Sequence, residues 1–143
     1  MDDTIRVFSI AGTSMYPLFS DGDIVIGKIF NGRIRMGNCY GFTNGTSRIF
    51  HRFVCRTNNR LIFSGDNSRY FESVELQDIF FSGDPFGPWM YNYCILLLNI
   101  LAYKSRLSKL ATRLKPMVAK KLSILLTMER TRCARERHIS NPK

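Results

Sequence analysis

The sequence predicts a mainly β fold: an antiparallel, partly closed β body followed by an α-helical, basic tail. Short runs of β-branched and aromatic residues recur through residues 1–84. Two of the connections, Asn31-Gly32 and Asn44-Gly45, tolerate positive φ and therefore favour tight hairpins. Beyond them the chain becomes first apolar and then basic. We therefore expect two parts, a β domain over residues 1–84 and a helical tail over residues 85–143.

Alternation of apolar and polar residues locates the individual strands. The clearest run covers residues 48–56, where His51 shares a face with Ile49 and Phe53 while Arg52 points to the other face. Expected strands are residues 5–10, 24–30, 39–43, 48–56, 61–63 and 77–81.

The segment 83–88 carries two glycines and two prolines, so it is expected to end the last strand. Residues 89–103 are strongly apolar, but a run of about fifteen residues is shorter than the ~20 that a membrane-spanning helix needs. A core-packing or interfacial helix is favoured there over a spanning one. Further on, basic residues alternate with Leu107, Leu110 and Leu114, which predicts an amphipathic helix that Pro116 interrupts and residues 117–128 resume.

The charge is divided unequally between the two parts. Residues 1–103 carry nine basic and nine acidic side chains, whereas residues 104–143 carry twelve basic and two acidic ones, which accounts for the whole net charge of +10. A neutral body argues against nucleic-acid binding by the body. We expect the tail to contact an anionic membrane surface, with the protein either on the cytoplasmic face or anchored through residues 89–103.

Other features of the composition narrow the class of protein. The first ten residues contain acidic and basic side chains and no long apolar run, so no signal peptide is expected. The cysteines Cys39, Cys55, Cys94 and Cys133 have no paired metal-type spacing and are expected to be reduced. Neither a metal nor a cofactor is expected.

The first chemically informative motif is Gly12-Thr13-Ser14-Met15-Tyr16-Pro17, closed by Asp21-Gly22-Asp23. Such a segment is usually a plain turn whose hydroxyl bonds local backbone. Ser14 becomes a nucleophile only if a base removes its proton. The chain has two histidines, and His51 lies inside a predicted strand. His51 is either a half-buried strand residue with a hydrogen-bond partner or the general base for Ser14.

A third motif, Gly65-Asp66-Asn67, follows the apolar run at residues 61–63. Taken alone, these residues indicate a turn. The three motifs together, in this order over about residues 7–84, resemble those of type I signal peptidases and their LexA-like relatives. His51-Arg52-Phe53-Val54 is similar to the endoplasmic-reticulum type, in which histidine replaces the more common lysine base.

This resemblance implies a LexA/signal-peptidase fold, Ser14 as nucleophile and His51 as general base. An acid would orient His51, and both Asp66 and Glu72 fit, with Asp66 slightly favoured because its motif matches best. The histidine-type enzymes carry an aspartate where this chain has Glu72. Asp78 is a weaker candidate, and Arg52 is expected to pair with an acid. The oxyanion would be bound by the backbone N–H of Ser14. Some relatives add a hydroxyl where this chain has Gly12, so other backbone donors or Thr13 would complete the site.

The function implied is a serine endopeptidase that cleaves a precursor peptide or protein, with small residues flanking the scissile bond. Its substrate is expected to bind as an extended strand near Ser14. One alternative is a non-catalytic adaptor at a membrane surface that keeps the peptidase fold. Another is a LexA-like regulator, which is disfavoured because no DNA-binding domain precedes Ser14 and no lysine occupies the position of His51.

Overall fold

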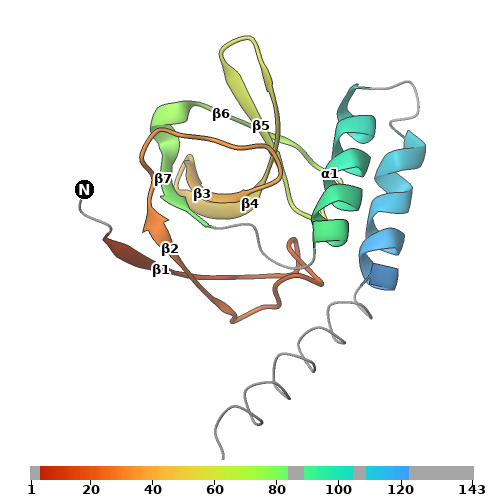
Figure 1. Cartoon of the computed structure of the whole chain (residues 1–143), viewed down its shortest axis with the longest axis horizontal. Coiled ribbons are helices and arrows are strands. Elements are labelled where there is room, and N and C mark those ends of the chain that lie inside the picture. The colour runs from red at the N-terminus through yellow and green to blue at the C-terminus, as the bar shows by residue number, and fades with distance from the viewer. Residues whose placement is uncertain (1–3, 84–88, 105–108, 123–143) are drawn as a thin grey trace, which may run out of the picture.

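The protein folds around one antiparallel sheet flanked by two helices (Figure 1). The computed structural model describes residues 4–83, 89–104 and 109–122. The strand order is β1-β2-β7-β3-β4-β5-β6, and neighbouring strands are antiparallel throughout. The predicted antiparallel β body is therefore confirmed. The strands are β1 (Ile5–Ser9), β2 (Ile24–Ile29), β3 (Cys39–Asn44), β4 (Ser47–Thr57), β5 (Arg60–Ser64), β6 (Glu72–Val74) and β7 (Ile79–Ser82).

The structure departs from the sequence expectation in four respects. The hairpin expected at Asn31-Gly32 is not formed, because β2 pairs with β1 and β7 while β3 pairs with β4 and β7. The strand β6 was not predicted, because three residues are too short to show an alternating pattern. The sheet is strongly curved in Figure 1, but β1 and β6 remain as its edges in the described residues, so the expected partial closure is not found. A short 3₁₀ turn, Leu76–Asp78, leads into β7 and replaces the start of the last predicted strand.

Aromatic side chains fill the interior of the curved sheet. Phe42, Phe53 and Phe63 form a cluster in which the Phe42 and Phe63 ring centroids lie 4.7 Å apart. A second cluster joins Phe50 and Phe81 to residues of the helices. Burial of large rings is the main stabilising contribution here, at roughly 25 cal/mol per Å² of apolar surface removed from water.

The helix α1 (Trp89–Lys104) packs against the body rather than standing apart from it. Its buried residues Tyr91, Ile95, Asn99 and Ala102 recur at spacings of four, four and three positions, whereas Trp89 is exposed. This spacing places the buried residues on one helical face. Core packing, which the sequence favoured for residues 89–103, is thus observed. No helix in the described ranges is long and apolar enough to cross a membrane.

A second helical run, residues 109–122, lies beside α1 in Figure 1. Its buried residues are Ala111, Lys115 and Ala119, while Leu110 and Leu114 are exposed. The predicted leucine stripe is therefore wrong: small alanines allow a close approach to the body, and a lysine sits between them. The run also includes Pro116, where an interruption was expected.

The tail and the β body share one core. Tyr91 and Ile95 of α1, and Ala119 of the second helix, belong to the same cluster as Ile10 and Met15. Cys39, Cys55 and Cys94 are free thiols. Burial raises the pKa of Cys39 to about 12, so its thiolate is scarce near neutrality. The predictions for Cys133, for most of the boundary 83–88 and for residues 123–143 fall outside the described residues.

Candidate active site

The Ser14 segment is a loop fastened at both ends between β1 and β2. Ile10 N–H donates to the carbonyl of Asp23 at 2.8 Å, and Gly12 N–H donates to the Asp21 carboxylate at 2.7 Å. Gly12 has φ +81°, a value that side-chain-bearing residues rarely adopt. These contacts explain the residue types at both ends of the first motif. The acidic residues close the loop, and the glycine makes the turn that precedes Ser14.

The residues after Ser14 hold the loop against the core. Met15 and Leu18 are almost completely buried, and both belong to the cluster that includes the helices. The peptide bond between Tyr16 and Pro17 is cis. The apolar anchors on the C-terminal side leave the Ser14 hydroxyl facing β4.

Ser14, His51 and Glu72 form a continuous hydrogen-bonded chain. His51 Nε2 lies 2.9 Å from Ser14 Oγ, and His51 Nδ1 lies 3.0 Å from Glu72 Oε2. The side chains of His51 and Glu72 are 7% and 15% exposed. Phe42 packs edge-on against the imidazole, with ring centroids 6.3 Å apart. The predicted proximity of Ser14 and His51 is therefore found, and the ring is restrained on two sides.

The carboxylate of Glu72 fixes the tautomer of His51. An ionised carboxylate can only accept hydrogen bonds, so the Nδ1 of His51 must carry the proton that is donated to Glu72. The lone pair on Nε2 is then directed to the Ser14 hydroxyl, which donates to it. This arrangement can remove a proton from Ser14 and stabilise the imidazolium that results.

The preference for Asp66 as the partner of His51 is wrong. Both carboxylate oxygens of Asp66 accept hydrogen bonds from Arg52, at 2.8 Å from Nε and 2.7 Å from a terminal nitrogen. The physical reason is the alternation of side chains in β4: Arg52 projects to the face opposite His51, and Asp66 lies on that face. The prediction that Arg52 pairs with an acid is confirmed. Asp78, the weaker candidate, is not the partner of His51 either.

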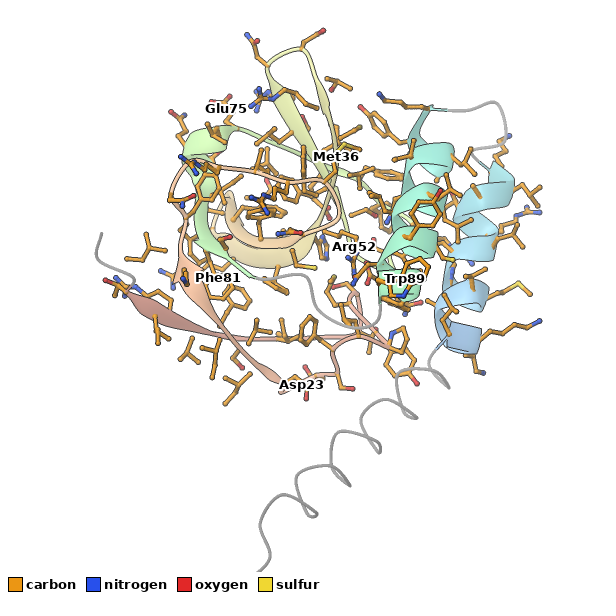
Figure 2. All side chains as sticks on the ribbon, viewed as in Figure 1. Asp23, Met36, Arg52, Glu75, Phe81 and Trp89 are labelled. Atoms are coloured by element: carbon orange, nitrogen blue, oxygen red, sulfur yellow. The ribbon has the colours of Figure 1, made fainter. Side chains whose placement is uncertain are left out.

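The Arg52–Asp66 pair is fully buried between the sheet and α1, and Arg52 is labelled there in Figure 2. Tyr91 donates its hydroxyl to Asp66 at 2.9 Å, and Arg52 also donates to Asn92 Oδ1 at 2.7 Å. Burial acts to lower the pKa of Arg52, but the charge and hydrogen bonds of Asp66, together with Cys39 and Tyr91, raise it overall. Burial and the same carboxylate raise the pKa of Tyr91. The guanidinium of Arg52 therefore stays charged, and its contacts with Asp66 and Asn92 hold α1 to the sheet.

The third motif also supports the Ser14 loop directly. Asn67 N–H donates to the carbonyl of Ser14 at 2.7 Å. A Cβ at Gly65 would lie 2.6 Å from that carbonyl oxygen and 2.9 Å from His51 Nε2. Only glycine fits at this point of closest approach. The Gly-Asp-Asn motif thus provides space beside Ser14 and His51, the acidic partner of Arg52, and a hydrogen bond to the Ser14 loop.

A pocket of about 250 Å³ is lined by Ser14 and His51. It lies between the end of β1 and the start of β4. A larger pocket of about 660 Å³ is lined by other residues, Phe30 and Leu76 among them. The pocket at Ser14 and His51 is further lined by Phe8, Ser9, Ile10, Ala11, Arg48, Ile49 and Phe50.

The backbone around Ser14 suits an oxyanion. In the described part of the chain, the N–H of Ser14 has no hydrogen-bond acceptor. It is therefore available to bind the negative oxygen that develops during attack on a carbonyl. The use of this donor in catalysis stays a prediction.

The functional residues that sequence reasoning missed come from the helices. Tyr91 and Asn92 contact the Arg52–Asp66 pair, and Lys115 is buried. Their role depends on contacts across many residues of sequence. One local signal was present: Lys115 lies four residues from both Ala111 and Ala119, on the face formed by the small residues.

Comparison with known proteins adds no assignment. No protein-family model matches the sequence, and no curated protein is significantly similar to it. The geometry of the site and the three sequence motifs are therefore the basis for assigning a function.

Proposed function

We propose that the protein is a serine endopeptidase of the signal-peptidase type that cleaves a precursor peptide or protein. Ser14 is the nucleophile, His51 the general base and Glu72 the acid that orients His51. The observation that carries the proposal is the pair of hydrogen bonds, 2.9 Å and 3.0 Å long, that joins these three side chains. They come from a loop, β4 and the start of β6, so the alignment depends on the whole fold.

The acylation step follows from this geometry. Ser14 Oγ forms a bond to the carbonyl carbon of the scissile peptide while its proton moves to His51 Nε2. The carbonyl electron pair moves to oxygen, and the N–H of Ser14 stabilises that charge. When the tetrahedral intermediate collapses, the C–N bond breaks and His51 returns the proton to the leaving amine.

Deacylation repeats the same transfers with water. His51 Nε2 takes a proton from water, and the oxygen forms a bond to the acyl carbon. Collapse breaks the bond to Ser14 Oγ, which regains its proton from His51. The acid product and free enzyme result. Throughout both steps Glu72 keeps the Nδ1 proton of His51 in place and balances the imidazolium charge.

The substrate proposed is an extended peptide. The strand β1 is an edge of the sheet, and the pocket between its end and β4 lies against Ser14 and His51. An edge strand can pair with an added strand through its backbone groups. The volume of about 250 Å³ limits the side chain that can enter this pocket. A small residue beside the scissile bond, as the resemblance implies, fits this limit.

A peptide library tests the proposal without the choice of one substrate. Purified protein is incubated with proteome-derived peptides, and new termini are identified by mass spectrometry. We expect cleavage at a restricted set of sites by the wild type and none by Ser14→Ala. The matched control is Ser47→Ala, because Ser47 is an exposed serine of β4 outside the site. Cleavage that persists in Ser14→Ala, or no cleavage of peptides or full-length precursors by the wild type, would favour the adaptor instead.

A further inference from the structure

One lysine of the basic tail is placed unlike the others in the described residues. Lys115 is only 1% exposed, whereas Lys109, Arg113 and Lys121 in the same helical run are exposed. Burying a charged amine costs several kcal/mol unless partners replace its water. A lysine in such a position therefore needs a specific set of contacts.

The amine of Lys115 has that set. It donates to Ser64 Oγ at 2.8 Å and to Asn99 Oδ1 of α1 at 2.7 Å, and it lies 5.5 Å from the centroid of the Phe71 ring. Ser64 is the last residue of β5, and Phe71 immediately precedes β6. The amine thus contacts both ends of the loop that joins these two strands, and α1 as well.

That loop carries the groups that arrange the candidate active site. Ser64 Oγ accepts from Lys115 and donates to the carbonyl of Tyr70 at 2.8 Å, which draws the two ends of the loop together. Between the ends, Asn67 N–H bonds the carbonyl of Ser14. Directly after the loop, Glu72 bonds His51. The loop therefore contacts the nucleophile segment at one point and orients the base at another.

We propose that Lys115 is a positioning residue of the peptidase: by holding the ends of the 64–71 loop, it keeps Glu72 against His51 and Asn67 against the Ser14 segment. The inference rests on the proposed function and extends it to the C-terminal tail. Docking of residues 109–122 then becomes a condition for an aligned catalytic site. Lys115 does not contact the reacting atoms, and it acts through the loop.

The charge on Lys115 contributes to this clamp. Burial lowers the pKa of Lys115 to about 8, while the carboxylates of Asp66 and Glu72 act to raise it and Arg52 acts to lower it. From α1, the polar group that faces the amine is the amide of Asn99. Below that pKa the hydrogen bond to Ser64 is charge-assisted, and such bonds are roughly twice as strong as neutral ones. Above it, the clamp weakens.

The test uses the full-length chain and begins with a signal that needs no substrate. The Nδ1 proton shared with a carboxylate gives a low-field proton resonance in NMR, and His138→Gln removes the only other histidine of the chain. We expect this resonance in the wild type and its loss or broadening in Lys115→Met. The control is Lys121→Met, an exposed lysine of the same helical run, which should keep it.

Reactivity of Ser14 gives the second readout. An alkyl fluorophosphonate forms a P–O bond with Ser14 Oγ as the P–F bond breaks, fluoride leaves and His51 accepts the serine proton. We expect Lys115→Met to react about ten-fold or more slowly, because small misplacements of aligned groups have effects of this size. The wild-type rate should decline as the pH passes about 8, and Lys115→Met should lack that decline. An arginine stays charged to far higher pH. Lys115→Arg should therefore react faster than Lys115→Met, and its rate should not decline as the pH passes about 8.

Two outcomes would overturn the inference. In one, Lys115→Met keeps both the low-field resonance and the wild-type reaction rate. In the other, Lys115→Met folds, loses rate and keeps the pH decline, so that Lys115 is not the titrating group. If Lys115→Met does not fold, Ser64→Ala removes the same hydrogen bond from the other side and should give the same loss. Failure of the proposed function looks different: the wild type itself would cleave no peptide, while the resonance would still report whether Lys115 positions Glu72.

Discussion

Adjacent residues of β4 organise two different environments. On one face, His51 meets Ser14 and Glu72 beside an open pocket. On the other, Arg52 and Asp66 form an ion pair that is 0% exposed and contacts α1. A single strand thus separates the histidine beside Ser14 from a buried, ion-paired arginine by the alternation of its side chains. The difference teaches that two carboxylates near one motif have different partners: Glu72 bonds the histidine beside Ser14, and Asp66 fixes a helix to the sheet.

The comparison predicts that changes on the His51 face alter rate and that changes on the Arg52 face alter stability. The largest expected effect is on rate. Ser14→Ala and His51→Ala should each lower kcat by about 10⁴-fold or more, and the double variant should be little worse, because the two groups act as a unit. Single-turnover assays on a peptide from the library would measure this. If the loss of kcat in the double variant equals the product of the two single losses, the two groups do not act as a unit.

Glu72→Gln tests the acid on the reactive face. The amide removes the negative charge and can present a donor to Nδ1, so His51 loses both its tautomer restraint and its charge balance. We expect kcat to fall by about 10³-fold to 10⁴-fold. The free energy of unfolding should change little, since Glu72 is partly exposed. Urea denaturation measures the free energy of unfolding. If Glu72→Gln reacts at a rate close to that of the wild type, Glu72 is not needed and the site is a Ser-His dyad.

Asp66→Asn tests the opposite face. The variant leaves the guanidinium of Arg52 buried without its counter-charge, and breaking a buried pair in this way costs about 3–5 kcal/mol. We expect the free energy of unfolding, measured in urea, to fall by that amount while the rate per folded molecule falls less than in Glu72→Gln. The comparison fails if Asp66→Asn is as stable as the wild type and loses more activity than Glu72→Gln.

The sequence predicted the parts of this arrangement that local patterns encode. Alternation placed His51 and Arg52 on opposite faces of β4, and Asn44-Gly45 placed the β3–β4 hairpin. The hairpin expected at Asn31-Gly32 is wrong, because β7 lies between β2 and β3 in the sheet, and this pairing comes from a distant part of the chain. The choice between Asp66 and Glu72 was not encoded locally, because it depends on β6, a strand of three residues that shows no pattern of its own. The buried face of residues 109–122 was missed for a related reason. The leucines predicted an apolar face, whereas the buried face consists of two alanines and one lysine.

The helical run 109–122 also has an exposed face and a buried face. Lys109, Arg113, Lys120 and Lys121 are exposed, and Lys115 is buried. Contact with an anionic membrane surface stays a prediction, and it concerns the outer face. Replacing the four exposed residues by Gln should weaken binding to phosphatidylserine-containing vesicles by about 1 kcal/mol per charge, and salt should weaken the wild type similarly. Lys115→Met should bind vesicles as the wild type does. Vesicle sedimentation measures both, and equal binding by the four-residue variant would contradict the prediction.

The smallest expected effect separates the influence of the Lys115 charge on Ser14 reactivity from its influence on the stability of the protein. Its pKa is lowered to about 8, chiefly by burial, whereas an unfolded lysine titrates near 10.5. Between these values the unfolded chain holds a proton that the folded chain has released, so the contribution of Lys115 to the free energy of unfolding rises with pH. From about pH 8 to about pH 9.5 this rise amounts to about 1.5 kcal/mol, since one pKa unit corresponds to about 1.4 kcal/mol.

Urea denaturation of the wild type and Lys115→Met at the two pH values would measure that difference. The wild type should gain stability relative to Lys115→Met as the pH rises. Over the same range, reactivity of Ser14 should decline in the wild type only. If stability rises while Ser14 reactivity declines, unfolding cannot explain the lost reactivity. Unfolding would lower both quantities together. If the two quantities fall in parallel, the alkaline loss of rate reflects a loosened fold, and the charge on Lys115 has no separate effect on the active site.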